Sequence, residues 1–254
     1  MNQRRKAPRI LILLHQAHST PGRIGRLLRA AGAELDICRH SLNDPLPETL
    51  ADHDGVVVFG GPMSANDDHE WVLRQVSWLE IPLREEKPLL GICLGAQMMT
   101  KTLGARVFTY PDQRAEIGYV PIKPCDAAAD RLCPARFPRC VYQWHRDGFD
   151  LPAGARLLAE GGEHFPVQAY CYGDGAVALQ FHPEVTYQMI CRWTVRGAER
   201  LTLPGAQARQ DHLDGWFQFD SIVDAWLRAF LPAWMSKGLQ APPPLAKERA
   251  LEVA

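Results

Sequence analysis

The segment KPLLGICLGAQMMTKTLGA, residues 87–105, decides how this 254-residue chain folds. Its apolar first part is typical of a strand buried on both faces, and the part after Cys93 has the composition of a helix. Cys93 therefore stands at a strand-to-helix turn, where Gly91 and Gly95 lack the side chains that would crowd a tight bend. Such a turn presents its central residue at the carboxyl edge of a parallel sheet, where α/β proteins bind ligands.

The chain before residue 104 repeats this alternation of apolar strands and helices. Strand patterns occur at 9–15, 34–40, 55–60 and 87–93, and helical patterns at 23–33, 67–80 and 94–105. Either Asp67 or Asp68 is a suitable cap for the second of these helices. Repeated βα units with continuous apolar strands predict a parallel sheet that helices cover on both faces.

After Gly104 the pattern changes to shorter strands separated by turn residues, at 105–110, 119–124, 140–145, 155–161, 167–172 and 176–182. The sequence Gly173-Asp174-Gly175 predicts a hairpin turn. We expect these antiparallel strands to join the parallel ones in one sheet system. The predicted fold class is thus α/β, a three-layer α/β/α arrangement with a mostly parallel central sheet and additional antiparallel strands.

The segment from Asp211 to residue 235 predicts a long amphipathic helix. Its apolar positions recur every three or four residues and form one stripe, Phe219, Val223, Trp226, Phe230 and Trp234. This pattern favours a helix packed on its own domain over a helix that binds a partner. We expect one domain over residues 1–235 and a weakly ordered tail over 236–254, which contains three consecutive prolines.

The composition limits the functional classes. A formal net charge of −1 gives no electrostatic basis for binding nucleic acid or a membrane surface, and no apolar run approaches a membrane span. The basic start precedes a short apolar run without a cleavage site, which predicts a buried strand rather than a signal peptide. Seven cysteines, an odd number, suit a reduced cytoplasmic protein. Their spacing lacks a metal-site pattern, so we expect no metal site among them.

Cys93 is a candidate nucleophile because of its place at the turn. The first N–H groups and the positive dipole end of the following helix favour a thiolate, and the same groups can stabilise an oxyanion. A candidate base is His182, which ends an apolar strand and is followed by Pro183 and Glu184. A carboxylate there can orient the imidazole and stabilise its protonated form. The alternative for Cys93 alone is a small buried core residue.

Two adjacent glycines, Gly60 and Gly61, end the strand at 55–60. Adjacent glycines expose backbone N–H groups that can face a developing negative charge. On its own, this pair is more typical of a flexible strand-to-loop turn.

The motifs GGP (60–62), GICLGAQ (91–97) and FHPE (181–184), in this order, resemble the class I glutamine amidotransferase family. The segments 116–122 (EIGYVPI) and 143–154 (QWHRDGFDLPAG) are similar to the glutaminase part of GMP synthetase and its free-standing relatives. The resemblance implies a flavodoxin-like fold. It also implies that Cys93 is the nucleophile, His182 the base and then the acid, and Glu184 its orienting group.

The same resemblance implies an oxyanion hole formed by Gly61 and the N–H of Leu94, next to Gly60. It implies a substrate pocket lined by Gln97, Gly118, Tyr119, Trp144, His145 and Asp147. One position departs from the family, which often has glycine where this chain has Arg146. That arginine either attracts a second carboxylate on a longer γ-glutamyl compound or is a solvated side chain.

The implied activity is hydrolysis of the side-chain amide of L-glutamine through a cysteinyl γ-glutamyl thioester. It releases glutamate, and ammonia for an acceptor or a synthase partner subunit. After His182 the sequence has no phosphate-binding loop, so the acceptor chemistry is expected elsewhere. Two alternatives stay open: a γ-glutamyl peptidase or hydrolase, and a catalytically silent binding module. Intact Cys93, His182 and Glu184 favour an enzyme over a silent module.

Overall fold

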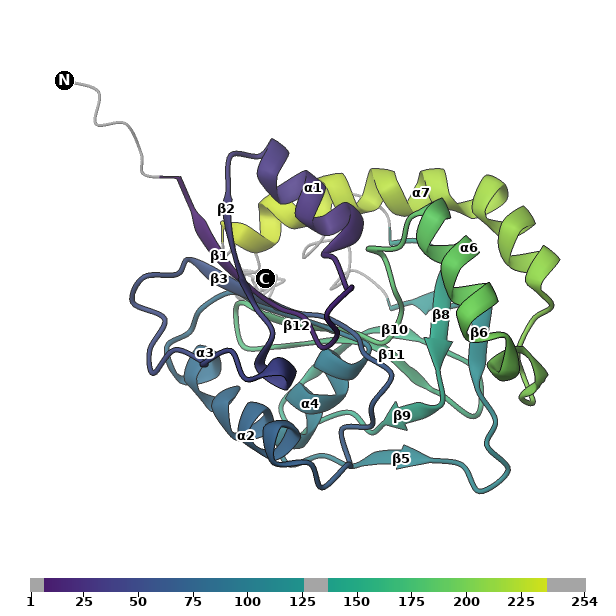
Figure 1. Cartoon of the computed structure of the whole chain (residues 1–254), viewed down its shortest axis with the longest axis horizontal. Coiled ribbons are helices and arrows are strands. Elements are labelled where there is room, and N and C mark those ends of the chain that lie inside the picture. Colours follow the sequence, from purple (N-terminus) through teal and green to yellow (C-terminus); the bar gives the residue numbers. More distant parts are fainter. Residues whose placement is uncertain (1–6, 126–136, 237–254) are drawn as a thin grey trace, which may run out of the picture.

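A computed structural model describes residues 7–125 and 137–236 of the chain (Figure 1). In these residues the main sheet has eight strands in the order β2-β1-β3-β4-β12-β11-β10-β7. Their bounds are β1 Arg9–Leu13, β2 Glu34–Cys38, β3 Gly55–Val58, β4 Leu89–Ile92, β7 Lys123–Pro124, β10 Arg156–Glu160, β11 Val167–Tyr172 and β12 Ala176–Leu179.

The sheet has a parallel part and an antiparallel part. Strands β2, β1, β3, β4 and β12 are parallel to one another, whereas β11 pairs antiparallel with β12, and β10 and β7 continue the antiparallel part. This arrangement confirms the predicted α/β class with a mostly parallel core and added antiparallel strands. The hairpin turn at residues 173–175 is confirmed as well, because Tyr172 of β11 pairs with Ala176 of β12.

Helices cover both faces of the sheet, as predicted. They are α1 Gly22–Ala30, α2 Glu70–Trp78, α3 Glu80–Arg84, α4 Leu94–Thr102, α6 Tyr187–Arg196 and α7 Arg209–Met235, with short 3₁₀ turns η1 His40–Leu42 and η2 Ala198–Thr202. The side chains of β1 alternate between two buried clusters. Ile10 and Ile12 pack on the side of α1 and α7, and Leu11 and Leu13 on the side of α2 and α4. Figure 1 shows the resulting three layers.

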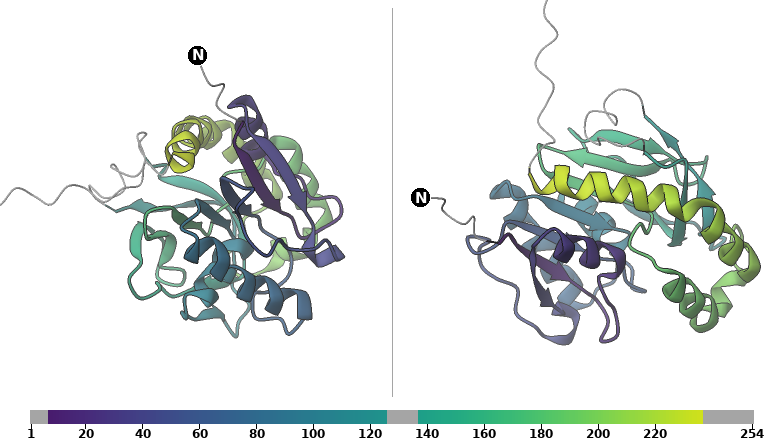
Figure 2. Two further views of the ribbon diagram at one scale, coloured as in Figure 1. Left: turned by 90° about the vertical axis from the view of Figure 1, so that its left-hand side faces the viewer. Right: turned by 90° about the horizontal axis from the view of Figure 1, so that it is seen from above.

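Helix α7 crosses the molecule along one face of the sheet (Figure 2, right). The predicted apolar stripe is buried at Val223, Trp226, Phe230 and Trp234. Trp226 packs against Phe137, with ring centroids 4.9 Å apart. The helix therefore completes the core of this chain, which agrees with the first of the two roles considered for it. The predicted tail from residue 237 lies outside the described residues.

Two expectations about local structure are wrong. The pairs β5 (Val107–Thr109) with β9 (Asp147–Phe149) and β6 (Glu116–Pro121) with β8 (Cys140–His145) form separate two-stranded sheets rather than joining the main one. Their apolar side chains are used elsewhere: those of β5 and β9 join the α4 cluster, and those of β6 and β8 pack on α6 and α7. His69, not an aspartate, is the N-cap of α2, because Asp67 accepts the backbone N–H of Ser64 instead.

This topology assembles the candidate site. Strands β3, β4 and β12 are consecutive neighbours in the sheet and are parallel, so their carboxyl ends meet at one edge. Gly60 follows β3, Cys93 follows β4 and His182 follows β12. Three segments far apart in the sequence are thereby brought to the same place. Within the described parts of the chain, no helix is long and apolar enough to cross a membrane.

Candidate active site

Cys93 occupies a strained backbone position at the turn between β4 and α4. It is the N-cap of α4, with φ 49° and ψ −107°, a region that residues other than glycine rarely adopt. The two flanking glycines permit it. A Cβ on Gly95 would lie 2.1 Å from the carbonyl oxygen of Val58, and one on Gly91 would lie 2.8 Å from the backbone of Gly95. The turn thus requires both glycines, as the sequence predicted.

His182 and Glu184 form a buried pair directly after β12. The Nδ1 of His182 lies 2.8 Å from Oε1 of Glu184, and the backbone N–H of His182 donates to the carbonyl of Tyr142. The ring is held on one side by the edge of Trp193, with centroids 5.1 Å apart. With Nδ1–H donated to the carboxylate, Nε2 is directed away from it and has no hydrogen-bond partner among the described residues.

The pKa of His182 is strongly perturbed. Burial alone lowers it, but the Glu184 carboxylate and the sulfur of Cys93 outweigh burial and raise this pKa to about 10. The imidazole therefore carries a proton at neutral pH. A protonated imidazole is the kind of neighbour that favours negative charge beside it.

Gly60 lies between Cys93 and His182. A Cβ built on it would be 2.8 Å from Cε1 of His182 and 3.4 Å from Cβ of Cys93. Gly61 is equally confined, because its Cβ would be 3.1 Å from the Leu94 side chain and 3.0 Å from that of His15. The structure thus brings the diglycine loop (Gly60–Gly61) next to the N-terminus of α4, whose first N–H groups have no partner within the helix.

His15, which was not selected from the sequence, holds the diglycine loop through a hydrogen bond to the Gly60 carbonyl. Burial lowers the pKa of His15 to about 4, so its ring is neutral. Its Nε2 lies 2.8 Å from the amide nitrogen of Gln75 and accepts from it, so Nδ1 carries the proton and donates to the Gly60 carbonyl at 3.2 Å. A trans peptide directs its N–H opposite to its C=O. This hydrogen bond therefore fixes the direction of the Gly61 N–H.

A small cavity of about 30 Å³ opens beside Cys93. Most of the predicted pocket residues line it together with Cys93, namely Gly61, Gln97, Trp144, His145 and Asp147, and Arg146 and Arg200 complete its rim. Half-buried Arg146 donates to the side chain of Gln113, 3.2 Å away. Within the described chain this arginine faces no carboxylate at ion-pair distance, so both interpretations of it stay open.

Asp147 is fixed by four hydrogen bonds. Its carboxylate accepts from Thr109 at 2.7 Å and from Ser64 at 2.5 Å. Its carbonyl accepts from Nε2 of Gln97 and from Nδ1 of His145, each at 3.0 Å. This contact orients the Gln97 amide. Its NH₂ group donates to Asp147, so its carbonyl oxygen is available to a donor in the cavity. His145 is oriented in turn by Glu116, whose Oε2 lies 3.1 Å from its Nε2.

Gly118 and Tyr119, which the family resemblance also implied, line neither this cavity nor the larger one described next. The Gln207 side chain fills the space beside β6: a Cβ on Gly118 would lie 2.1 Å from its Oε1. Gln207 also bonds both the N–H and the carbonyl of Tyr119. The ring of Tyr119 packs against Phe219 of α7.

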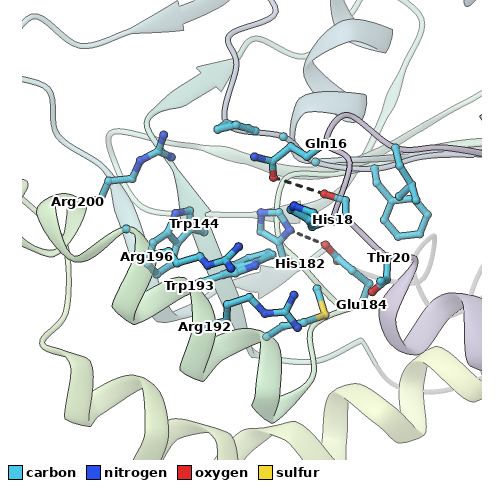
Figure 3. Close-up of a pocket in the computed structure, with 18 of the residues that line it drawn as sticks. Gln16, His18, Thr20, Trp144, His182, Glu184, Arg192, Trp193, Arg196 and Arg200 are labelled. Atoms are coloured by element: carbon cyan, nitrogen blue, oxygen red, sulfur yellow. Dashed lines mark hydrogen bonds and ion pairs between the residues drawn. The ribbon is translucent and has the colours of Figure 1, made fainter. Parts of the chain in front are cut away.

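His182 lines a larger cavity of about 350 Å³ (Figure 3), whereas Cys93 lines only the small one. It shares Gly61, Pro62, Trp144 and Arg200 with the small cavity, so the two meet beside the diglycine loop. Its remaining walls include His182 and Trp193, the loop from Gln16 to Thr20, and Arg192 and Arg196 of α6. These arginines were not predicted as site residues from the sequence. Their spacing of four was visible, but the position of α6 over the site was not.

Helix α7 is connected to the site through Arg23, a buried residue of α1. Its guanidinium donates to the carbonyl of Val185, next to Glu184, and forms ion pairs with Asp220 and Asp224 of α7. The backbone N–H of Arg23 donates to the carbonyl of Glu184 at 2.8 Å. The loop that follows His182 is thus held from both α1 and α7.

The candidate site of this α/β protein thus combines a cysteine at a strand-to-helix elbow with a His–Glu pair after the strand on one side and a diglycine loop after the strand on the other. The comparisons place the protein in a family. The sequence model described as "Glutamine amidotransferase class-I" matches residues 17–189, and the chain belongs to this family.

The chain is similar to several relatives. It is 30% identical to the glutamine amidotransferase-like protein YfeJ of Salmonella typhimurium over 189 residues, 72% of this chain and 78% of that one. Crystal structures of glutamine amidotransferases from Methylobacillus flagellatus and Thermotoga maritima, each 27% identical, superpose with TM-scores of 0.83 and 0.79. They cover 95% and 91% of this chain, and this chain covers 99% of each.

The chain is also 37% identical to the GMP synthase of Thermomicrobium roseum over 135 residues, which are 52% of this chain. It spans only 24% of that synthase. The match therefore concerns one part of the larger enzyme.

Proposed function

We propose that this chain hydrolyses the side-chain amide of L-glutamine through a γ-glutamyl thioester on Cys93. The observation that carries the proposal is the position of Cys93 at the elbow, next to a histidine that Glu184 orients at 2.8 Å and keeps protonated. Membership of the class I glutamine amidotransferase family supports the choice of glutamine.

The first half-reaction forms the thioester. The Cys93 thiolate attacks the side-chain carbonyl carbon of glutamine, and the carbonyl oxygen becomes negatively charged. The N–H groups of Gly61 and Leu94 stabilise this oxyanion. Protonated His182 then donates its Nε2 proton to the nitrogen, the C–N bond breaks and ammonia leaves.

The second half-reaction releases glutamate. Neutral His182 takes a proton from a water molecule, which attacks the thioester carbonyl. The tetrahedral intermediate expels the Cys93 thiolate, and the protonated histidine and thiolate are restored together. Glu184 keeps its charge throughout, because it orients the ring and stabilises the imidazolium without accepting its proton.

The residues that line the small cavity suit the amino acid end of the substrate, which needs more room than about 30 Å³ and therefore also takes up part of the adjoining larger cavity. The free carbonyl oxygen of Gln97 is positioned to accept from the α-ammonium group, since its NH₂ group is bound to Asp147. Trp144 and Asp147 complete this subsite. We propose that the ammonia passes to an acceptor or a partner subunit, and neither metal nor cofactor enters the scheme.

The test is glutamate release from glutamine by the purified chain. We expect release that Cys93→Ala abolishes and that Cys171→Ala, a matched change at a buried cysteine of β11, retains. Unchanged release in Cys93→Ala would overturn the proposed mechanism. No release and no modification of Cys93 by a glutamine-like diazoketone would favour the silent binding module instead.

A γ-glutamyl hydrolase that uses the same thioester is the second candidate. The observation in its favour is the cavity of about 350 Å³ that His182 lines, because an ammonia leaving group needs much less room than this.

A further inference from the structure

The larger cavity, which His182 lines, is much larger than ammonia, the proposed leaving group, requires. Its volume is about 350 Å³, whereas a molecule the size of water or ammonia takes up roughly 30 Å³ in a liquid. Part of its wall is apolar, with Trp193 and Met189 from α6 and Trp144 from β8. Such a wall suits the carbon skeleton of a larger leaving group.

Three arginines add positive charge to this cavity. Arg192 and Arg196 are four residues apart on α6, and Arg200 follows on η2. Figure 3 shows the side chains of Arg192 and Arg196 extending from α6 on the side of Trp193 and His182. In the described chain none of the three is within ion-pair distance of a carboxylate, whereas Arg23 and Arg228 are both paired.

The acidic groups of the cavity do not neutralise this charge. Glu184 is bonded to protonated His182, so that pair contributes no net charge. Glu199 is the other carboxylate in the lining; like Arg192 and Arg196 it is exposed, and it can offset only one of the three positive charges. Opposite the arginines, Ser19 and Thr20 contribute hydroxyl groups from the loop after β1. The cavity therefore has an excess of positive charge and several hydrogen-bond donors.

The place of this charge relative to the scissile bond follows from the two cavities. A γ-glutamyl group bound beside Gln97 has its carbonyl at Cys93 and its leaving nitrogen toward His182, which must protonate that nitrogen. The larger cavity begins there, and Arg200 lines both cavities at their junction. Substituents on the leaving nitrogen thus extend toward the arginines.

We propose that the larger cavity is a subsite for a carboxylate-bearing leaving group, and that γ-glutamyl amino acids are the preferred substrates over free glutamine. This inference rests on the proposed thioester chemistry. The bond between the γ-carbonyl carbon and the amino acid nitrogen breaks, His182 supplies the proton to that nitrogen, and water hydrolyses the thioester. The guanidinium groups bind the carboxylate, for which their planar donor pairs are suited.

The test compares γ-glutamylglycine with γ-glutamylglycinamide, which has nearly the same shape without the charge. We measure kcat/KM for glutamate release from each and from glutamine. The expected result is a preference of about tenfold or more for the carboxylate, the scale of one charge-assisted hydrogen bond. The preference should weaken as salt concentration rises.

Arg196→Gln and Arg192→Gln should each reduce this preference, and the double variant should bring the ratio close to one. Arg74→Gln is the matched control, because Arg74 is an exposed arginine on α2, outside both cavities. It should leave the ratio unchanged. A ratio near one in the unmodified chain, or a ratio that the double variant preserves, would overturn the subsite.

Binding measurements separate this failure from failure of the proposed function. Cleavage of all three compounds at similar rates would leave the thioester mechanism standing without the subsite. If none is cleaved, titration calorimetry with Cys93→Ala measures binding of γ-glutamylglycine and of its amide. Tighter binding of γ-glutamylglycine supports the subsite, provided that the arginine double variant loses this difference. Equal or undetectable binding of the two overturns it.

Discussion

The replacement Glu184→Gln isolates the charge that keeps His182 protonated. Glutamine has the same shape as glutamate, and its carbonyl oxygen can still accept from Nδ1 of His182 at the observed 2.8 Å. What changes is the electrostatic stabilisation of the imidazolium. Its pKa is raised from 6.5 to about 10 by Glu184 and Cys93 against the opposing effect of burial. Without the carboxylate, burial still lowers this pKa and only the sulfur of Cys93 raises it.

The expected magnitude follows from this balance. One adjacent opposite charge changes a pKa by about one to three units, so we expect that of His182 to fall by about two units. This equals roughly 3 kcal/mol of lost stabilisation of the imidazolium. A histidine with a raised pKa acts as an acid below that pKa and loses this role above it. The alkaline limit of thioester formation should therefore move toward neutral pH in the variant.

The assay is single-turnover release of ammonia, the product of thioester formation, as a function of pH from neutral to strongly alkaline. Glu199→Gln is the control, because this carboxylate lines the larger cavity but has no hydrogen bond to His182. It should leave the alkaline limit unchanged. An alkaline limit that stays near pH 10 in Glu184→Gln, or that moves equally in both variants, would refute the assigned role of the His182–Glu184 pair.

Three further predictions concern the support of the site. His15→Phe should lower kcat about tenfold or more with little change in KM, because it removes the hydrogen bond to the Gly60 carbonyl that fixes the direction of the Gly61 N–H. Steady-state kinetics test this, and an unchanged kcat would contradict it. Gly95→Ala should lower the free energy of unfolding by about 2 kcal/mol or more, because its Cβ would lie 2.1 Å from a backbone oxygen. Denaturant titration measures this against Gly162→Ala, where nothing lies within 4 Å of the added Cβ, and equal losses would count against the reasoning. Arg23→Met should destabilise the fold by about 3 kcal/mol or more, since it leaves Asp220 without its buried partner; thermal unfolding that matches the parent chain would exclude this role for the ion pair.

The sequence was sufficient for the parts of the site that depend on local pattern. The two glycines around Cys93 predicted the elbow, and the apolar strands before Gly60 and His182 predicted that both residues emerge at the same edge. Neighbouring parallel strands then bring the three together, which needs no knowledge of side-chain packing.

The sequence failed where a distant segment decides the environment. His15 looks like any polar residue that ends a strand, and only the pairing of β1 with β3 puts it under the carbonyl of Gly60. The family resemblance implied Tyr119 as a pocket residue, and no local pattern shows that Gln207, far along the chain, hydrogen-bonds its backbone. The side chains of Arg192 and Arg196 face the cavity because of how α6 is anchored, which no local pattern encodes.

The measurement that tests the central claim most directly is mass spectrometry of the chain quenched in acid during turnover of glutamine. Peptide mapping locates any added γ-glutamyl group. The account predicts one such group, on the peptide that contains Cys93, absent in Cys93→Ala and removed when turnover is allowed to finish. Glutamate release without this adduct, or an adduct on another cysteine, would contradict it.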